Sequence, residues 1–444
     1  MSYEFQAGAA SVEITPHTAL HLAGYPHVQR QSTGTHDPLL SSALYLECNG
    51  QRAFIVANDV IYVSKALVAK ARHRIEETTG VPASNILVSA THTHSGPKML
   101  DPVATSGDVS VPKTNAGCVA FVEDGIVSAA QLAFANARPA EAGLTEADAM
   151  GIGTNRREPA GPRDLIVPVL IVRDANTNAP LAAMLVCNMH PTVLHEDSTL
   201  ISGDFPALAR QYLQQHVLGN DCVVLYHTGP AGNQSPRHVT KANTFHEATR
   251  LAAILGSAAA QVIPAIEYRR DLRIETRSAM FNIPLRTFPT EAVAQARLAR
   301  SIANLKSLRE SNVPRTQIRT AETDWFGAEE TLTLARAKAS GALEAAARSA
   351  MPAEVQLIRV GPWSFIAWPG EMFVEFGIEL KKQSARTFPI AYANGELQGY
   401  LVTRQAVEEG GYESSNAIFK SPDGGETLIR TTLELLNTSR HLES

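Results

Sequence analysis

The stretch Asn85-Ile-Leu-Val-Ser-Ala-Thr-His-Thr-His-Ser-Gly-Pro97 contains the features that decide the fold. Its first half, Ile86–Ala90, is a short apolar run typical of a buried strand. A Gly-Pro pair ends the stretch. Successive side chains of a strand alternate between its faces, so we expect His92 and His94 to point to the same side. Because ligands in α/β folds commonly bind at strand ends, this predicts two imidazoles in a site.

The segments around this stretch alternate between strand and helix. Two apolar runs, 42–48 and 53–57, flank Asn49-Gly50, which predicts a hairpin. Ser64 is placed to cap a helix over Lys65–Glu77. Further strands are expected at 165–172, 181–189 and 222–226, and further helices at 118–135, 205–217 and 243–260. This alternation predicts a mixed-sheet α/β core.

The segment from about 290 to 351 differs in composition. It is rich in Ala, Arg, Leu and Glu and breaks near Asn312-Val-Pro314, which predicts two antiparallel helices inserted into the domain. The composition leaves open whether these helices only pack or also wall a cleft. A hairpin over Gly361-Pro362 and helices at 374–382 and 426–436 are expected to follow. We predict one catalytic domain over residues 1–444.

Composition narrows the class of protein. The 444 residues are 44% hydrophobic and 19% charged, which is a globular profile, with 39 basic and 44 acidic residues. No basic block stands out, so we expect no nucleic-acid partner. We expect no stable membrane association either, because no apolar run reaches the length of a membrane span and no export signal is visible. Four scattered cysteines suggest reduced thiols in a cytoplasmic protein. A homo-oligomer is left open.

Three more residues with metal-binding or catalytic side chains follow predicted strands. His190 comes after 181–186, Ser235 lies in the small-residue loop 227–237, and Glu371 follows a strand that ends at Trp368. Each also has an ordinary structural interpretation, respectively a hydrogen-bonded histidine, a local loop cap and an acid in a first helical turn. Imidazole and carboxylate groups together suit Zn²⁺.

Asp204 has two compatible interpretations. It precedes a predicted helix, so it fits an N-cap. It also follows the His190 segment along the chain, where a carboxylate could orient a histidine that binds metal.

In this order, the motifs resemble the N-terminal catalytic domain of the neutral (non-lysosomal) ceramidase family, over nearly the whole chain. The matching segments are Ala7–Pro16, Ala23-Gly-Tyr25, Gly34–Pro38, Thr91–Pro97, Asn155-Arg156, His190-Pro-Thr192, Gly232–Arg237, Pro369-Gly-Glu371, Gly399–Thr403 and Tyr412-Glu413. Each motif is weak alone, but the ordered set is specific.

The resemblance implies a zinc site and a set of residues around it. The zinc ligands would be His92, His190, Glu371 and Tyr400. The residues near the reacting bond would be His94, Ser235 as the proposed nucleophile, Tyr412, Arg156, and Gly24 through its backbone N–H. Bound zinc polarises a carbonyl and lowers the pKa of bound water, so either water or Ser235 would attack.

Departures from the family pattern shape the expected substrate. Asn233 stands where the family usually has Asp, and neither an immunoglobulin-like C-terminal domain nor a signal peptide is expected. Arg156 and Arg237 favour an acidic or polar substrate group, because guanidinium groups bind carboxylates bidentately. We therefore expect a zinc-dependent hydrolase that cleaves an amide or related carbonyl bond in a small soluble substrate.

Several alternatives stay open. The chain could be a true ceramidase acting on N-acyl sphingoid lipids, or use the same fold on an ester, lactone or glycoside. It could also bind zinc without catalysis, although structural zinc sites are usually closed by Cys and His. An amidohydrolase barrel is disfavoured, since that fold carries its His-x-His on the first strand.

Overall fold

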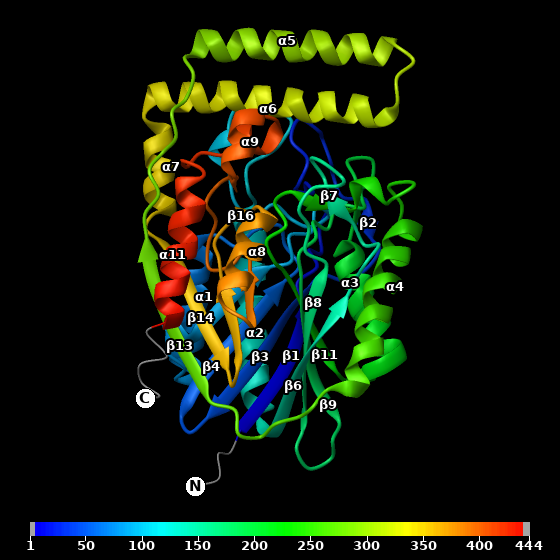
Figure 1. Ribbon diagram of the computed structural model, residues 1–444, viewed down its shortest axis with the longest axis vertical. Helices are drawn as coiled ribbons and strands as arrows, with labels where there is room; N and C mark the ends of the chain where they lie inside the picture. Colours follow the sequence, from blue (N-terminus) through cyan, green and yellow to red (C-terminus); the bar gives the residue numbers. More distant parts are fainter. Residues whose placement is uncertain (1–4, 438–444) are drawn as a thin grey trace.

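The computed structural model describes residues 5–437, which form two main β-sheets with helices outside them (Figure 1). The eight-stranded sheet has the order β11 (Val223–Thr228), β9 (Pro180–Cys187), β8 (Ile166–Asp174), β6 (Arg138–Asp148), β1 (Phe5–Glu13), β3 (Leu40–Cys48), β4 (Gln51–Asn58), β5 (Ile86–Ala90). The four-stranded sheet has the order β13 (Ile274–Phe281), β14 (Ala353–Val360), β15 (Trp363–Ala367), β17 (Thr387–Ile390).

The large sheet divides into two halves at the contact between β1 and β6. These strands pair only through Gln6–Ala7 and Arg138–Pro139, at the start of each strand. Both halves and the four-stranded sheet bury apolar side chains in one shared core. β5, β9 and β11 end at the same edge of the molecule, where the loops that follow them meet. There the Thr228 hydroxyl donates to the Thr91 carbonyl, and the Gly229 N–H donates to the Cys187 carbonyl.

Alternating side chains explain why the sheets are covered on both faces. Leu44 and Leu46 of β3 belong to the shared core, whereas Ala43 and Tyr45 face helices on the other side. Strand side chains alternate with a period of two, so one strand supplies both layers.

Helices cover the outer faces. α1 (Lys65–Thr79) and α2 (Ala116–Ala135) pack on one half of the large sheet, α3 (Asp204–Leu213) and α4 (Phe245–Val262) on the other, and α8 (Val374–Gln383) and α11 (Asp423–Asn437) on the small sheet. The mixed α/β class expected from the sequence is confirmed.

One sequence expectation about apolar length is corrected. By length and composition, Ala116–Ala135 and Phe245–Ala265 are long and apolar enough to cross a membrane. Both helices pack against the large sheet, and core helices often pass the same test. The length and composition of these two helices are therefore weak evidence for a membrane-spanning segment.

Local signals gave accurate boundaries in the first hundred residues. Asn49 and Gly50 both have positive φ, 52° and 78°, as the predicted hairpin turn requires. Ser64 caps α1 by accepting a hydrogen bond from the Leu67 N–H, and Gly80 ends the helix at φ 68°.

The four cysteines are free thiols.

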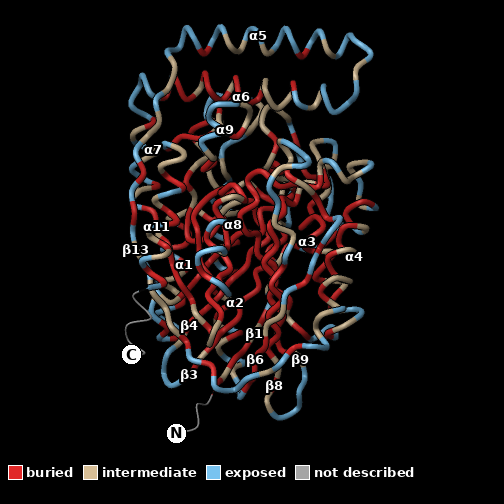
Figure 2. The backbone as a smooth tube through the Cα atoms, in the orientation of Figure 1, coloured by how far each residue is buried: buried red, intermediate tan, exposed pale blue. Residues whose placement is uncertain are grey.

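The inserted segment forms three helices, not the expected two. α5 (Glu291–Glu310) and α6 (Arg315–Ser340) are antiparallel, and α7 (Ala342–Ala350) follows a break at Gly341, where φ is 80°. α6 lies against the body of the molecule and α5 lies outside it (Figure 1). α5 is exposed along most of its length (Figure 2), with only Ala294 and Leu305 buried.

Candidate functional site

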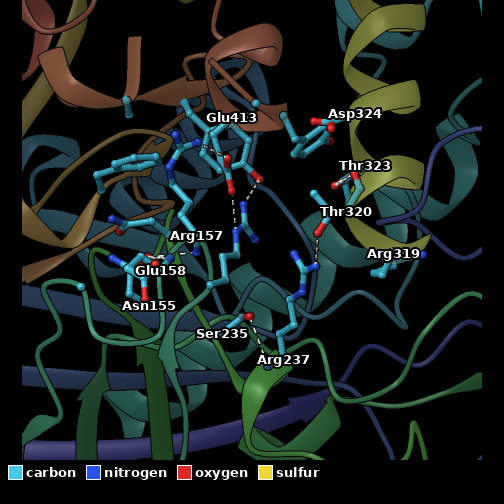
Figure 3. Close-up of a pocket in the computed structure, with 18 of the residues that line it drawn as sticks. Asn155, Arg157, Glu158, Ser235, Arg237, Arg319, Thr320, Thr323, Asp324 and Glu413 are labelled. Carbon is cyan, nitrogen blue, oxygen red and sulfur yellow. Dashed lines mark hydrogen bonds and ion pairs between the residues drawn. The ribbon is translucent and has the colours of Figure 1, made fainter. Parts of the chain in front are cut away.

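Loops that follow several strands meet at one cavity of about 810 Å³. Figure 3 shows part of its lining, with Asn155, Arg157, Ser235 and Arg237 on one side and residues of α6 on the other. His94 also lines it. His92, which lies immediately next to His94, is buried, so the cavity leads to a group of enclosed side chains.

Two buried histidines point unprotonated nitrogens at each other. His92 Nδ1 donates to the Ile61 carbonyl at 2.8 Å, and His190 Nδ1 donates to the Ala231 carbonyl at 2.6 Å. Burial lowers the pKa of both rings, that of His92 to about 3, so both are neutral at physiological pH. Each Nε2 therefore carries a lone pair, and these two atoms lie 3.1 Å apart.

A carboxylate completes this arrangement. Glu371 Oε2 lies 3.3 Å from His190 Nε2 and 3.6 Å from His92 Nε2, with no hydrogen-bond donor among the described residues. Its Oε1 accepts a hydrogen bond from the Tyr62 hydroxyl. Burial alone would raise the pKa of Glu371, but the two histidines and Tyr62 bring it down to about 2, so the group is ionised. Three electron-pair donors that face one another need a cation between them, so this cluster can hold a metal ion.

Tyr400 is held beside this carboxylate by a short parallel pairing. β16 (Glu371–Met372) pairs with β18 (Tyr400–Leu401), with Glu371 opposite Tyr400. The Tyr400 hydroxyl accepts a hydrogen bond from Arg156 Nη2 at 3.1 Å. The structure thus brings together all four residues expected as metal ligands.

His94 joins the group from the cavity side. Its Nε2 lies 3.2 Å from His92 Nε2, and His92, His94 and His190 form a set that could bind metal. The two histidines of the motif do share a side, but not through strand alternation. β5 ends at Ala90, and His92 has a left-handed backbone with φ 64°.

The other expected residues line the same cavity. β12 (Gln234–Ser235) pairs with β7 (Thr154–Asn155), which places Ser235 opposite Thr154, and the Arg156 N–H donates to the Asn233 carbonyl at 2.7 Å. Ser235 Oγ also accepts a hydrogen bond from the Arg237 N–H at 3.3 Å, so the local cap exists as well. Tyr412 opens α10 (Tyr412–Asn416), with its ring centroid 6.0 Å from that of Tyr400.

The interpretations of Asp204 are wrong in detail. It is the first residue of α3, and the N-cap position is Gly203. Its Oδ2 accepts from the backbone N–H groups of Val193 and Leu194, at 3.0 and 2.9 Å. Backbone carbonyls, rather than this carboxylate, orient the rings of His92 and His190. Asp204 fixes the loop that follows His190.

Sequence reasoning missed two tyrosines at the site. Tyr62 binds Glu371, and Tyr392 stacks on the His92 ring with centroids 3.9 Å apart. Both lie just after strands, β4 and β17, so the strand-end rule that found the histidines could have found them.

Residues 5–248 match the family model described as neutral/alkaline non-lysosomal ceramidase, N-terminal. The chain belongs to this family. Neutral ceramidase B of Dictyostelium discoideum is 27% identical over 235 residues, which cover 48% of this chain and 32% of that protein. Neutral ceramidase of Mycobacterium tuberculosis is 27% identical over 237 residues, covering 48% and 36%. The match thus spans about a third of the length of these curated relatives.

The structural similarity to this family extends beyond the residues that match in sequence. The crystal structure of neutral ceramidase from Pseudomonas aeruginosa superposes with a TM-score of 0.74 at 19% identity, covering 97% of this chain and 73% of that one. At this identity the likeness concerns the fold alone.

In this ceramidase-family chain, one of the inserted helices, α6, does wall the cavity. Thr316, Arg319, Thr320, Thr323 and Asp324 of α6 all line it. A smaller side cavity of about 120 Å³ shares His94 with the first cavity. Most of its surface is apolar, from residues such as Ile61, Leu100 and Val111, but the charged side chains Lys98, Glu330, Glu371 and Glu396 also line it.

Proposed function

We propose that this chain is a zinc-dependent amidase that hydrolyses an N-acyl amide of the ceramide-like class. The observation that carries the proposal is the convergence of His92 Nε2, His190 Nε2 and Glu371 Oε2 directly behind the cavity residue His94. Two nitrogens on one tetrahedral zinc, each bonded at roughly 2.0–2.1 Å, lie about 3.3 Å apart. The observed 3.1 Å between the histidine nitrogens is close to that spacing.

The substrate class takes support from the relatives. Sequence composition favoured a small soluble amide, whereas the curated relatives are named neutral ceramidases, which favours the lipid-like alternative. The apolar side cavity beside His94 suits an acyl chain. The proposed substrate is therefore an amide with an apolar acyl group.

The residues of this chain would divide the work as follows. His92, His190, Glu371 and Tyr400 would hold the zinc, which when bound polarises a carbonyl and lowers the pKa of bound water. His94 lacks a hydrogen-bond partner at Nδ1 among the described residues, so its ring is free to move a proton to the leaving nitrogen. Water adds to the carbonyl carbon, the C–N bond breaks, and a carboxylic acid and an amine leave.

The test is a hydrolysis assay on N-dodecanoyl amides and on matched dodecanoyl esters, with the zinc content measured. We expect about one zinc per chain, amide cleavage that a chelator abolishes, and loss of both zinc and activity in His190→Ala. Zinc retained at full occupancy in that variant would refute the ligand set. Zinc without cleavage of any substrate would favour a binding protein, and faster cleavage of the esters would favour the ester alternative.

A further inference from the structure

Of the arginines that line the cavity, only Arg237 lacks a carboxylate partner among residues 5–437. The others are paired as follows: Arg156 with Glu413, Arg157 with Glu413 and Glu409, and Arg319 with Glu196 and Glu322. These pairs neutralise their cations within the protein. Arg237 has no carboxylate within 4.0 Å among the described residues, and Glu413 and Asp324 act on its charge only from farther away.

The guanidinium of Arg237 is anchored through one nitrogen and leaves the rest free. Its Nη2 donates to Thr320 Oγ1 at 2.8 Å and to the Thr316 carbonyl at 3.3 Å, both on α6 (Figure 3). Within the described part of the chain, Nε and Nη1 have no acceptor. The side chain is fixed in direction, and its Nε and Nη1 donors remain available to a ligand.

The surroundings of Arg237 disfavour its charge. Burial, together with the neighbouring cations Arg156 and Arg319, lowers the pKa of Arg237 from its ordinary value. Asp324 lines the same cavity without coming within 4.0 Å of Arg237. An anion bound to Nε or Nη1 would compensate the charge of Arg237 at close range.

We propose that Arg237, held in place by Thr320, forms a subsite for a carboxylate on the amine portion of the substrate, so that N-acyl amino acids are preferred over neutral N-acyl amides. Because Nη2 already donates to α6, a carboxylate oxygen would accept a charge-assisted hydrogen bond from the free Nε or Nη1 of Arg237. The acyl chain belongs in the apolar side cavity, so the carboxylate lies on the leaving side. Hydrolysis then adds water across the C–N bond and releases a fatty acid and an amino acid. This proposal rests on the proposed amidase function.

The experiment compares N-dodecanoylglycine with N-dodecanoylethanolamine, which share the acyl chain and amide but differ in the carboxylate. We expect the wild type to have the higher kcat/KM on the glycine amide. Arg237→Met should lower that value by about 10- to 100-fold, mainly through KM, and change the neutral substrate less than about threefold. Arg237→Lys keeps the charge but loses the guanidinium donors. Its kcat/KM on the glycine amide should therefore lie between that of the wild type and that of Arg237→Met.

The controls distinguish failure of the carboxylate subsite from failure of the proposed amidase function. Arg430→Gln, at an exposed position of α11 outside the cavity, should leave both substrates unaffected. Equal loss on both substrates in Arg237→Met, or no preference in the wild type, would overturn the carboxylate subsite while leaving the amidase intact. If neither amide is cleaved, the proposed function fails. Titration calorimetry with the same two compounds then decides the subsite, and equal affinities would overturn it.

Discussion

At the scale of single residues, Gly24 and His94 form the tightest fit in the site. Gly24 has φ +107°, and a Cβ built on it would lie 2.5 Å from Cγ of the His94 ring. Real Cβ atoms do not approach that closely, so any other residue would displace the imidazole. The glycine keeps the His94 ring against His92 and opens the cavity to it.

Gly24→Ala should therefore lower the activity of the enzyme by more than its loss of stability accounts for. We expect about 1–3 kcal/mol of destabilisation from the left-handed backbone and the clash, and at least about tenfold loss in kcat/KM from the displaced ring. The measurements are chemical unfolding and amide hydrolysis. Gly80→Ala is the matched control, because its φ is +68° and nothing lies within 4 Å of the added Cβ. If the control loses as much activity, the displacement of His94 is not the cause.

His94→Ala should separate catalysis from metal binding. His92 and His190 have a carbonyl that fixes the ring, whereas His94 Nδ1 has no partner among the described residues, which suits a group that moves protons. We expect full zinc occupancy and a loss of about 100-fold or more in kcat. His73→Ala, at an exposed site on α1, should change neither quantity. Parallel loss of zinc and activity would make His94 a ligand.

At the scale of elements, Asn233 ties the Ser235 loop to α8. Its Nδ2 donates to Glu375 Oε2 at 2.8 Å, and its Oδ1 accepts from the Val374 N–H at 2.8 Å. The amide is needed because it donates to one group and accepts from another. An aspartate, the residue expected from the family pattern, would place a second carboxylate against Glu375.

Asn233→Asp should destabilise the protein in a pH-dependent way. Burial already raises the pKa of Glu375, and a facing carboxylate raises one pKa of the pair further. A carboxyl whose pKa is higher in the folded state favours folding at low pH, and this contribution is lost as the pH rises through that pKa. We expect a loss of about 1–3 kcal/mol at pH 8 and a smaller loss at pH 5, measured by urea unfolding. Asn233→Ser removes both hydrogen bonds without adding a charge, so its loss should vary less with pH than that of Asn233→Asp. A loss for Asn233→Asp that varies with pH no more than that of Asn233→Ser would rule out the charge pair.

Some elements were predictable from sequence and others were not, for physical reasons. The hairpin at Asn49-Gly50 and helix α1 carry strong local turn and cap signals. β1 carries none, because its Ala- and Gly-rich sequence is adapted to close packing, and a Cβ on Gly8 would overlap the Ala133 carbonyl of α2. β13 has a largely polar and half-exposed sequence, which hides it from a search for apolar runs.

The same distinction holds within the site. Predicted strand ends made His92, His190 and Glu371 candidates, and the family resemblance grouped them with Tyr400. The hydrogen bond of Tyr62 and the stacking of Tyr392 depend on how two sheets meet, which no local pattern records.

At the scale of the whole molecule, the site is built where both halves of the large sheet and the small sheet meet. His92 follows β5, His190 follows β9, and Glu371 follows β15. A cation shared by these three therefore links parts of the fold that otherwise meet through apolar packing. Metal binding should contribute to global stability as well as to chemistry.

Removing the metal should lower the Tm of the wild type. Binding to the folded state alone contributes about 4 kcal/mol when free metal is at a thousand times its Kd. We expect a drop of several degrees on dialysis against chelator, restored by zinc, in differential scanning calorimetry. His190→Ala should show a lower Tm that neither treatment moves. An unchanged wild-type Tm after complete metal removal would contradict this coupling.

The spread of the cluster along the chain also bears on how the protein is made in the cell. During translation His92 and His190 are synthesised long before Glu371, and Tyr400 comes later still. A nascent chain therefore has no complete binding site until most of its length has left the ribosome. Loading of the metal would be a late event in biosynthesis, and chains truncated before Glu371 should not retain it.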